Sequence, residues 1–175
     1  MTLLTRRSSK LLFAGAICAV ALALFAADSG AGATPAQTNQ MSFTATATGT
    51  IAGVTKLPGG LTQINFNGSG NATFLGNITG SLTRIQDNQG NFGSTGVIVG
   101  ANGKDNVFLS ISGQFTGGGG NNKCVVSSTG TYTVTGGAGA FANATGSGTL
   151  QTQFDLCAGT ASGTYTGTIS QPNSN

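Results

Sequence analysis

The fold is decided by the glycine-rich stretch Tyr132-Thr-Val-Thr-Gly-Gly-Ala-Gly-Ala-Phe141-Ala-Asn-Ala-Thr-Gly-Ser-Gly-Thr-Leu150. Alternating residues stand on both sides of a glycine cluster, and this pattern predicts a strand, a glycine turn and a second strand. Consecutive glycines permit the positive φ angles of such a turn, and Phe141 is then expected to re-enter the interior as a packing anchor. The stretch therefore predicts antiparallel β-structure, and it holds no side chain that would identify a reaction.

Apolar residues alternate with threonine and serine along most of the remaining chain. The alternation is clearest from Met41 to Ile51, from Phe92 to Val99 and from Thr160 to Ser170, and turn residues separate about eight such segments. No segment beyond residue 40 has helical periodicity. We therefore predict an all-β protein, an eight-stranded antiparallel β-barrel, with a β-sandwich as the alternative.

Turn residues also divide the region between residues 61 and 86. Asn67-Gly68 is a typical turn dipeptide, so a short strand over 61–66 is expected to end there. The next strand is expected over Asn71–Gln86, and a period of two places Phe74 and Arg84 on the same face of it.

The first 33 residues have the three parts of a secretory signal peptide. Arg6 and Arg7 precede the uncharged apolar run Leu11–Ala27, and Ala31-Gly32-Ala33 supplies the small residues that signal peptidase requires. Cleavage is predicted after Ala33, with residues 27 and 36 as alternative sites. An uncleaved anchor is disfavoured because the apolar run is shorter than the roughly 20 residues that span a bilayer. The twin arginines leave both the Sec and the twin-arginine export routes open.

The chain is thus divided into a signal peptide (1–33), a flexible leader (34–40), a β-barrel domain (41–171) and a C-terminal tail (172–175). This organisation predicts a secreted or periplasmic, extracytoplasmic protein that has no stable membrane insertion after cleavage. The pI near 9.0 belongs mostly to the signal peptide, because four bases and three acids beyond residue 33 leave a net charge of about +1. Nucleic acids and anionic lipids need clustered bases, so neither is an expected partner.

Two cysteines, Cys124 and Cys157, lie beyond the signal peptide. Paired cysteines in an exported chain predict a disulfide, and closing a loop of about 34 residues stabilises the fold by about 3–4 kcal/mol in the chain-entropy model. A metal site or a catalytic thiol is the alternative, but the chain contains no histidine to support either.

The segment Val134–Gly148 resembles the hairpin GGTGxFxxAxGxG of the allene oxide cyclase/dirigent barrel superfamily, which includes exported bacterial proteins. The matching positions are Gly136, Gly137, Gly139, Phe141, Ala144, Gly146 and Gly148, whereas Ala138 and Ala140 depart from the usual residues. The resemblance implies an eight-stranded barrel with an apolar interior, often assembled into homo-oligomers. Plant members cyclise an unsaturated fatty-acid epoxide or orient phenoxyl radicals, but none of their functional polar residues can be matched in this chain.

No catalytic residue, metal site or cofactor is assigned, because residues 34–175 contain neither histidine nor glutamate. The three aspartates in that region lie in or beside predicted turns, where carboxylates accept backbone N–H groups. They are Asp87, Asp105 and Asp155.

Four residues are candidates for contact with a ligand: Arg84, Tyr132, Phe141 and Tyr165. Arg84 could bind a carboxylate at the barrel mouth through its guanidinium fork. The alternatives are that it snorkels from the rim to water or that a bulge reverses its face. The tyrosines could direct hydroxyls into a cavity, or they could be core residues with one satisfied hydrogen bond, and Phe141 could be a ligand wall or only core.

These observations leave three functions open. The first is a secreted, non-catalytic barrel that binds a small apolar ligand or acts as a scaffold, because an eight-stranded barrel is either filled or holds one small molecule. The second is a structural or surface protein of the cell envelope. The third is an isomerase like allene oxide cyclase, which the missing histidine and glutamate disfavour. An internal cavity with a converging polar group would favour the first.

Overall fold

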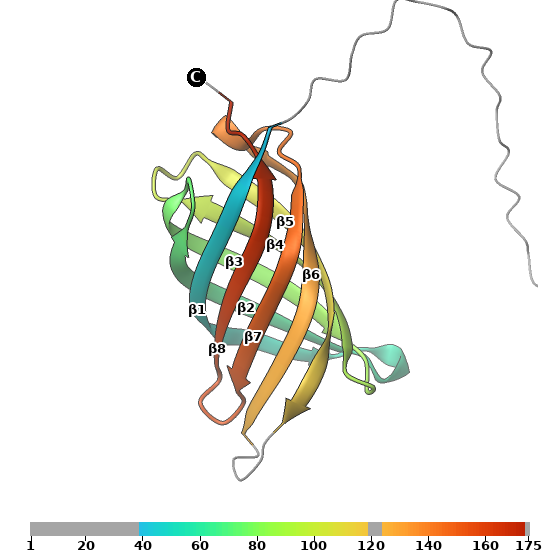
Figure 1. Ribbon diagram of the computed structural model, residues 1–175. Coiled ribbons are helices and arrows are strands. Elements are labelled where there is room, and N and C mark those ends of the chain that lie inside the picture. The colour runs from blue at the N-terminus through green and yellow to red at the C-terminus, as the bar shows by residue number, and fades with distance from the viewer. Residues whose placement is uncertain (1–38, 119–123, 174–175) are drawn as a thin grey trace, which may run out of the picture. The chain divides into compact units, whose positions relative to one another are not determined.

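The computed structural model describes residues 39–118 and 124–173 as one closed barrel of eight antiparallel strands (Figure 1). The strands are β1 (Gln40–Lys56), β2 (Thr62–Ala72), β3 (Gly76–Gln86), β4 (Asn91–Gly100), β5 (Asn106–Gly118), β6 (Val125–Ala138), β7 (Gly146–Asp155) and β8 (Thr160–Ser170). Each strand pairs with its neighbours in the chain, and β1 pairs with β8 to close the barrel. The predicted eight-stranded barrel is confirmed, and the sandwich alternative is wrong. The predicted signal peptide lies outside the described residues.

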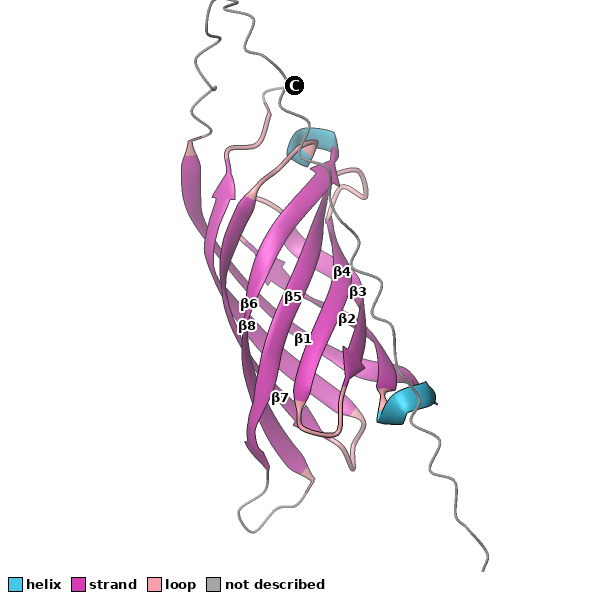
Figure 2. Cartoon of the chain, turned by 90° about the vertical axis from the view of Figure 1, so that its right-hand side faces the viewer, coloured by secondary structure: helices cyan, strands magenta, loops and turns pink. Residues whose placement is uncertain are grey.

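Two three-residue 3-10 helices lie at opposite ends of the barrel (Figure 2). The helix η1 (Pro58–Gly60) joins β1 to β2, and η2 (Gly139–Phe141) follows β6. The ends are named here by what they carry: the η2 end and, opposite to it, the disulfide end. No helix among the described residues has the length and apolarity that a membrane span requires.

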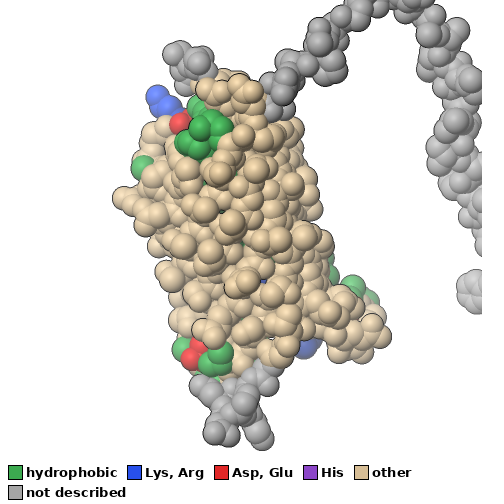
Figure 3. Space-filling view, viewed as in Figure 1, with side chains coloured by type: hydrophobic (Ala, Val, Ile, Leu, Met, Phe, Trp, Pro, Cys, Tyr) green, Lys and Arg blue, Asp and Glu red, His purple; other side chains and the backbone are tan. Residues whose placement is uncertain are grey.

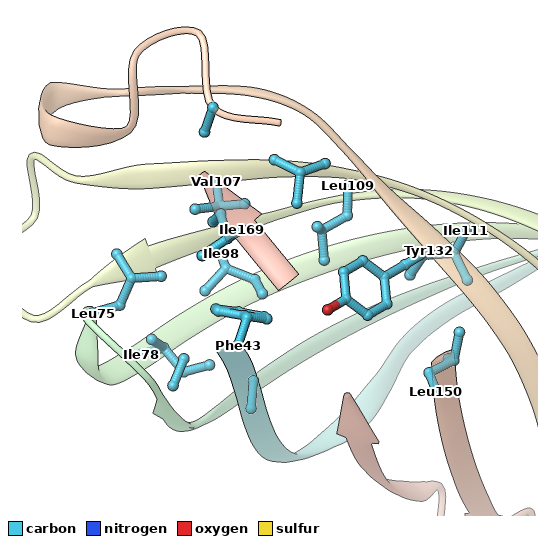
Figure 4. Close-up of a cluster of buried hydrophobic side chains, with 14 of the residues drawn as sticks. Phe43, Leu75, Ile78, Ile98, Val107, Leu109, Ile111, Tyr132, Leu150 and Ile169 are labelled. Carbon is cyan, nitrogen blue, oxygen red and sulfur yellow. The ribbon is translucent and has the colours of Figure 1, made fainter. Parts of the chain in front are cut away.

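Apolar residues that alternate with polar ones in the sequence point into the barrel, and the polar ones point outward. Along β1, Phe43 and Ala45 are buried while Thr44 and Thr46 are exposed. Inward-facing side chains of all eight strands, together with Leu75 and Phe141, form the main apolar core, part of which is drawn in Figure 4. Its members include Phe43, Leu75, Ile78, Ile98, Val107, Leu109, Ile111, Tyr132, Leu150 and Ile169.

The predicted turn at Asn67-Gly68 is wrong, since β2 runs through it to Ala72. The chain turns instead at residues 73–75, where Phe74 has a φ of 68° and is 43% exposed. This turn is held on β1, because the backbone N–H of Thr73 donates to the carbonyl of Thr44 over 2.9 Å. Gly68 faces inward and pairs with Gly49 of β1, so its small size serves a close approach between strands rather than a turn.

The glycine motif closes the η2 end of the barrel. After β6 the chain forms η2 and a turn, and the second strand of the predicted strand–turn–strand unit, β7, begins at Gly146. Phe141 is 2% exposed and is packed into the core, as predicted. The Asp105 carboxylate accepts the backbone N–H of Ala140 over 2.8 Å, and it thereby ties η2 to the β4–β5 turn.

The predicted disulfide is present at the other end. Cys124, just before β6, is bonded to Cys157 in the β7–β8 turn, with a Cα–Cα distance of 5.3 Å. The bridge therefore ties the start of β6 to the turn that follows β7.

Candidate ligand-binding cavity

A small apolar cavity lies inside the barrel, between the main core and the disulfide end. Its volume is about 120 Å³. The wall includes Leu82 of β3, Ile98 of β4, Leu150 of β7 and Tyr165 of β8. The interior is therefore not completely filled, and the space is comparable to the roughly 150 Å³ that accommodates benzene in an engineered protein cavity.

Glycines at inward positions leave this space open. Gly68 of β2 is paired with Gly49 of β1 on one side and with Gly80 of β3 on the other, and all three line the cavity. A Cβ atom at Gly68 would lie 2.6 Å from the carbonyl oxygen of Thr48 on the neighbouring strand. The strands approach too closely there for a side chain, so the backbone itself forms part of the cavity wall.

Among the described residues that line this cavity, Arg84 is the only one with a charged side chain. It lies near the end of β3 and faces inward, opposite Ser94 of β4, and it is 2% exposed. The predicted face is therefore correct, but the side chain does not snorkel to water and does not sit at an open mouth. Burial lowers the pKa of the guanidinium from its ordinary value to about 10, because desolvation disfavours the charged form.

Four phenylalanine rings surround the Arg84 guanidinium, and we call them the phenylalanine cage: Phe66, Phe92, Phe115 and Phe154. The guanidinium carbon lies 3.9 Å from the centroid of the Phe92 ring and 4.6 Å from that of Phe154. Its distance to each of the other two centroids is 5.6 Å. These separations are within the range in which an aromatic face attracts a cation.

The cage does not satisfy the hydrogen-bonding groups of Arg84. Phenylalanine has no acceptor atom, and Nε and Nη1 of Arg84 are buried without a hydrogen-bond partner. The hydroxyl of Ser94, directly across the β3–β4 ladder, is likewise buried and unpartnered. Two neighbouring polar side chains at one point of the interior are thus left without partners by the described chain.

The aspartates of the described chain do not neutralise Arg84. Asp87 accepts the backbone N–H groups of Gln89 and Asn91 and the side-chain amide of Asn91, which lowers its pKa. Asp105 accepts from Ala140 and from the Asn102 amide, and its pKa is lowered for the same reason. Asp155 accepts two backbone N–H groups in the β7–β8 turn. Each carboxylate therefore organises a turn.

The two tyrosines form an edge-to-face pair beside the cavity. The ring of Tyr165 lies in the cavity wall and packs edge to face on Tyr132, with 5.8 Å between ring centroids. Tyr132 is 1% exposed, its hydroxyl has no partner, and burial raises its pKa to about 12. Burial also raises the pKa of Tyr165, while the nearby Arg84 acts in the opposite direction. Tyr132 thus packs against the Tyr165 ring that lines the cavity.

Of the four predicted contact residues, the structure brings Arg84 and Tyr165 together in one cavity wall. Tyr132 touches the cavity only through Tyr165, and Phe141 lies in η2, where it closes the far end of the barrel. Cys124, Cys157 and Asp155 have ligand atoms within 4.8 Å of one another, but the disulfide occupies both sulfur atoms. This cluster consequently offers no thiolate to a metal ion.

Sequence reasoning missed the phenylalanine cage. Its members come from four strands, and all of them face inward toward the disulfide end. Strand direction and the period of two indicate which end and which face each ring occupies. Only closure of the barrel determines that all four rings meet at Arg84.

No protein-family model, no curated protein and no solved structure matches this chain. Its function must therefore be argued from the cavity and the residues around it.

Proposed function

We propose that the protein is a secreted, non-catalytic barrel that binds a small apolar molecule in its interior. The observation that carries the proposal is the internal cavity of about 120 Å³, whose wall includes many aliphatic and aromatic side chains and glycines, together with Arg84 and several threonines and serines. Such a space is large enough for one ring or a short branched chain, and apolar cavities of this kind take up matching ligands.

The proposed extracytoplasmic location is supported by two features. The Cys124–Cys157 disulfide is the kind of bond that persists in oxidising compartments. Many exposed positions of the strands hold threonine, serine, asparagine or glutamine, and the face drawn in Figure 3 carries few charged side chains. An outer face in contact with lipid would instead need a continuous apolar band.

The absence of histidine and glutamate beyond residue 33 argues against acid–base catalysis, and each described aspartate is held in a turn. We keep the relationship to the allene oxide cyclase/dirigent superfamily as a proposal that rests on the segment 134–148. Homo-oligomer formation is proposed on the same resemblance.

A role at the cell envelope is the second candidate. The outer faces of β1, β2, β7 and β8 form a shallow polar surface that includes Thr46, Ser69, Gln151 and Thr164. A surface of this kind suits contact with hydrated polymers and makes no use of the cavity.

The proposal is tested by binding of a neutral probe, benzyl alcohol, to the purified full chain by calorimetry and thermal unfolding. We expect saturable binding of one molecule and a higher Tm. Ala161 lines the cavity, so Ala161→Leu should fill it and abolish binding, whereas Ala52→Leu on the exposed outer side of β1 should not. Mass spectrometry of molecules released from the natively purified protein should identify the ligand. If no small molecule is released and no probe binds, the envelope role is favoured.

A further inference from the structure

We propose that the natural ligand is a small apolar or aromatic monocarboxylate, and that Arg84 is the residue that binds its carboxylate. This inference rests on the proposed binding function and specifies its ligand class. It is carried by a buried guanidinium with unpartnered N–H groups in the wall of an otherwise apolar cavity.

The phenylalanine cage attracts the charge of Arg84 but provides no acceptor for its N–H groups. The aromatic faces attract the positive charge, but a guanidinium directs its five N–H bonds in its own plane. Those bonds need acceptor atoms, and at least Nε and Nη1 have none among the described residues. Buried polar groups are ordinarily paired, so an unpaired cation beside a cavity indicates an acceptor that the chain itself does not provide.

The shape and charge of a carboxylate fit the guanidinium of Arg84. A carboxylate is planar and presents two oxygens to the guanidinium fork, so it can pair with two parallel N–H groups. Among the described residues that line the cavity, Arg84 is the one cation, which matches a ligand with a single negative charge. A phosphate ester would bring up to two charges and a larger hydrated group to a wall that offers no second cation among those residues.

The apolar part of the ligand is limited by the size of the cavity. The carboxylate would lie at the phenylalanine cage, and the remaining space is bounded by Leu82, Ile98, Leu150 and Tyr165. A volume of about 120 Å³ admits a single ring or a short branched chain and excludes a long acyl chain that lies wholly inside. The wall thus selects a compact acid of about the size of benzoate.

A second unpartnered polar side chain, Ser94, lies opposite Arg84. Its hydroxyl is buried on β4. It can donate a hydrogen bond, but Ser94 is not among the described residues that line the cavity, so the carboxylate is assigned to Arg84 alone.

The experiment compares benzoate with benzyl alcohol, which has a similar size and no charge, by calorimetric titration of the full chain. We expect benzoate to bind the wild-type protein at least 10-fold more tightly than benzyl alcohol. Arg84→Met should remove this preference or reverse it. Lys104→Met, which deletes an exposed cation in the β4–β5 turn, should leave the preference unchanged.

A second measurement needs no variant. The full chain contains three arginines, Arg6, Arg7 and Arg84, so its ¹⁵N spectrum has three Nε–H signals. Saturation with benzoate should shift one of them, and benzyl alcohol should shift none to a comparable extent.

The outcomes separate the two proposals. Equal affinity for both probes, or a benzoate preference that survives Arg84→Met, overturns the carboxylate assignment and leaves the apolar binding function intact. An Nε–H spectrum unchanged at saturating benzoate also overturns it. If neither probe binds the wild-type protein, the binding function itself is wrong.

Discussion

At the scale of single residues, the interior holds polar groups that folding alone does not satisfy. The charge of Arg84 disfavours the folded state at neutral pH, because burial lowers its folded pKa to about 10 while the unfolded chain keeps the higher ordinary value. That penalty is fully present below pH 10 and diminishes as the pH rises above 10. Tyr132 carries an unpartnered hydroxyl and has the opposite pH dependence.

Tyrosinate absorbance reports the combined ionisation of the two tyrosines of this chain, which has no tryptophan. In the folded protein we expect little ionisation at pH 10 and a transition for Tyr132 near pH 12. The unfolded chain should ionise near pH 10. Because the folded pKa is raised, the stability that Tyr132 contributes is complete below pH 10 and is lost by about 2 kcal/mol as the pH approaches 12.

Tyr132→Phe identifies the signal of each residue, since it leaves Tyr165 as the only tyrosine. The substitution should raise the free energy of unfolding at pH 7 by about 1 kcal/mol, because it removes a buried hydroxyl that has no partner. A tyrosine that ionises normally at pH 10 in the folded wild type would contradict the burial of both rings.

At the scale of strands, glycine determines how closely neighbouring strands approach. Gly49, Gly68 and Gly80 are aligned across β1, β2 and β3 by the pairing register, all at inward positions. They allow the sheet to bend into a small barrel and leave the cavity open. Most other glycines in the strands, such as Gly146, also lie against a carbonyl oxygen of the neighbouring strand, whereas Gly93 has nothing within 4 Å of an added Cβ atom, so each glycine has to be judged by its own neighbours.

Gly68→Ala and Gly93→Ala test this difference. At Gly68 the new Cβ would lie 2.6 Å from a backbone oxygen, so we expect the free energy of unfolding to fall by about 1–3 kcal/mol. At Gly93, which is exposed on β4, nothing lies within 4 Å of the new Cβ. That substitution should be neutral or stabilise by up to about 1 kcal/mol, since it reduces the entropy of the unfolded chain.

Urea unfolding of both variants beside the wild type provides the measurement. Equal destabilisation by the two substitutions would show that loss of glycine flexibility, and not close strand approach, is what matters.

At the scale of the whole molecule, closure and the disulfide stabilise different parts of the structure. Closure pairs β1 with β8, so residues as distant as Gln40 and Ser170 are neighbours in the sheet. No strand is left with an open edge, which protects a nearly uncharged, threonine-rich chain from edge-to-edge association. The disulfide adds a covalent link at the end that is farthest from η2.

Removal of the disulfide should weaken the barrel without changing its architecture. The loop between Cys124 and Cys157 spans a sequence separation of 33, so the double substitution Cys124→Ser/Cys157→Ser should lower the free energy of unfolding by about 3–4 kcal/mol. Circular dichroism should still show β-structure at low temperature. Reduction of the wild type should shift the urea midpoint by the same amount. A loss of unfolding free energy below about 1 kcal/mol would contradict the entropic account.

The sequence by itself determined which residues alternate, which two cysteines pair and that Phe141 is buried, because these features depend on local periodicity and composition. It also placed Arg84 on an inward face. Asn67-Gly68 misled because turn propensity is a weak local preference, which the close packing of β1, β2 and β3 overrides.

Only the tertiary structure decided what surrounds Arg84. The four cage rings come from β2, β4, β5 and β7, and the cavity wall adds β8, so the environment depends on the order of closure and on the strand registers. Local patterns determine the direction in which each side chain points. Whether the side chains that point inward meet a partner, a ring or an empty space depends on contacts between distant parts of the chain, and this is why the site emerges only in the folded barrel.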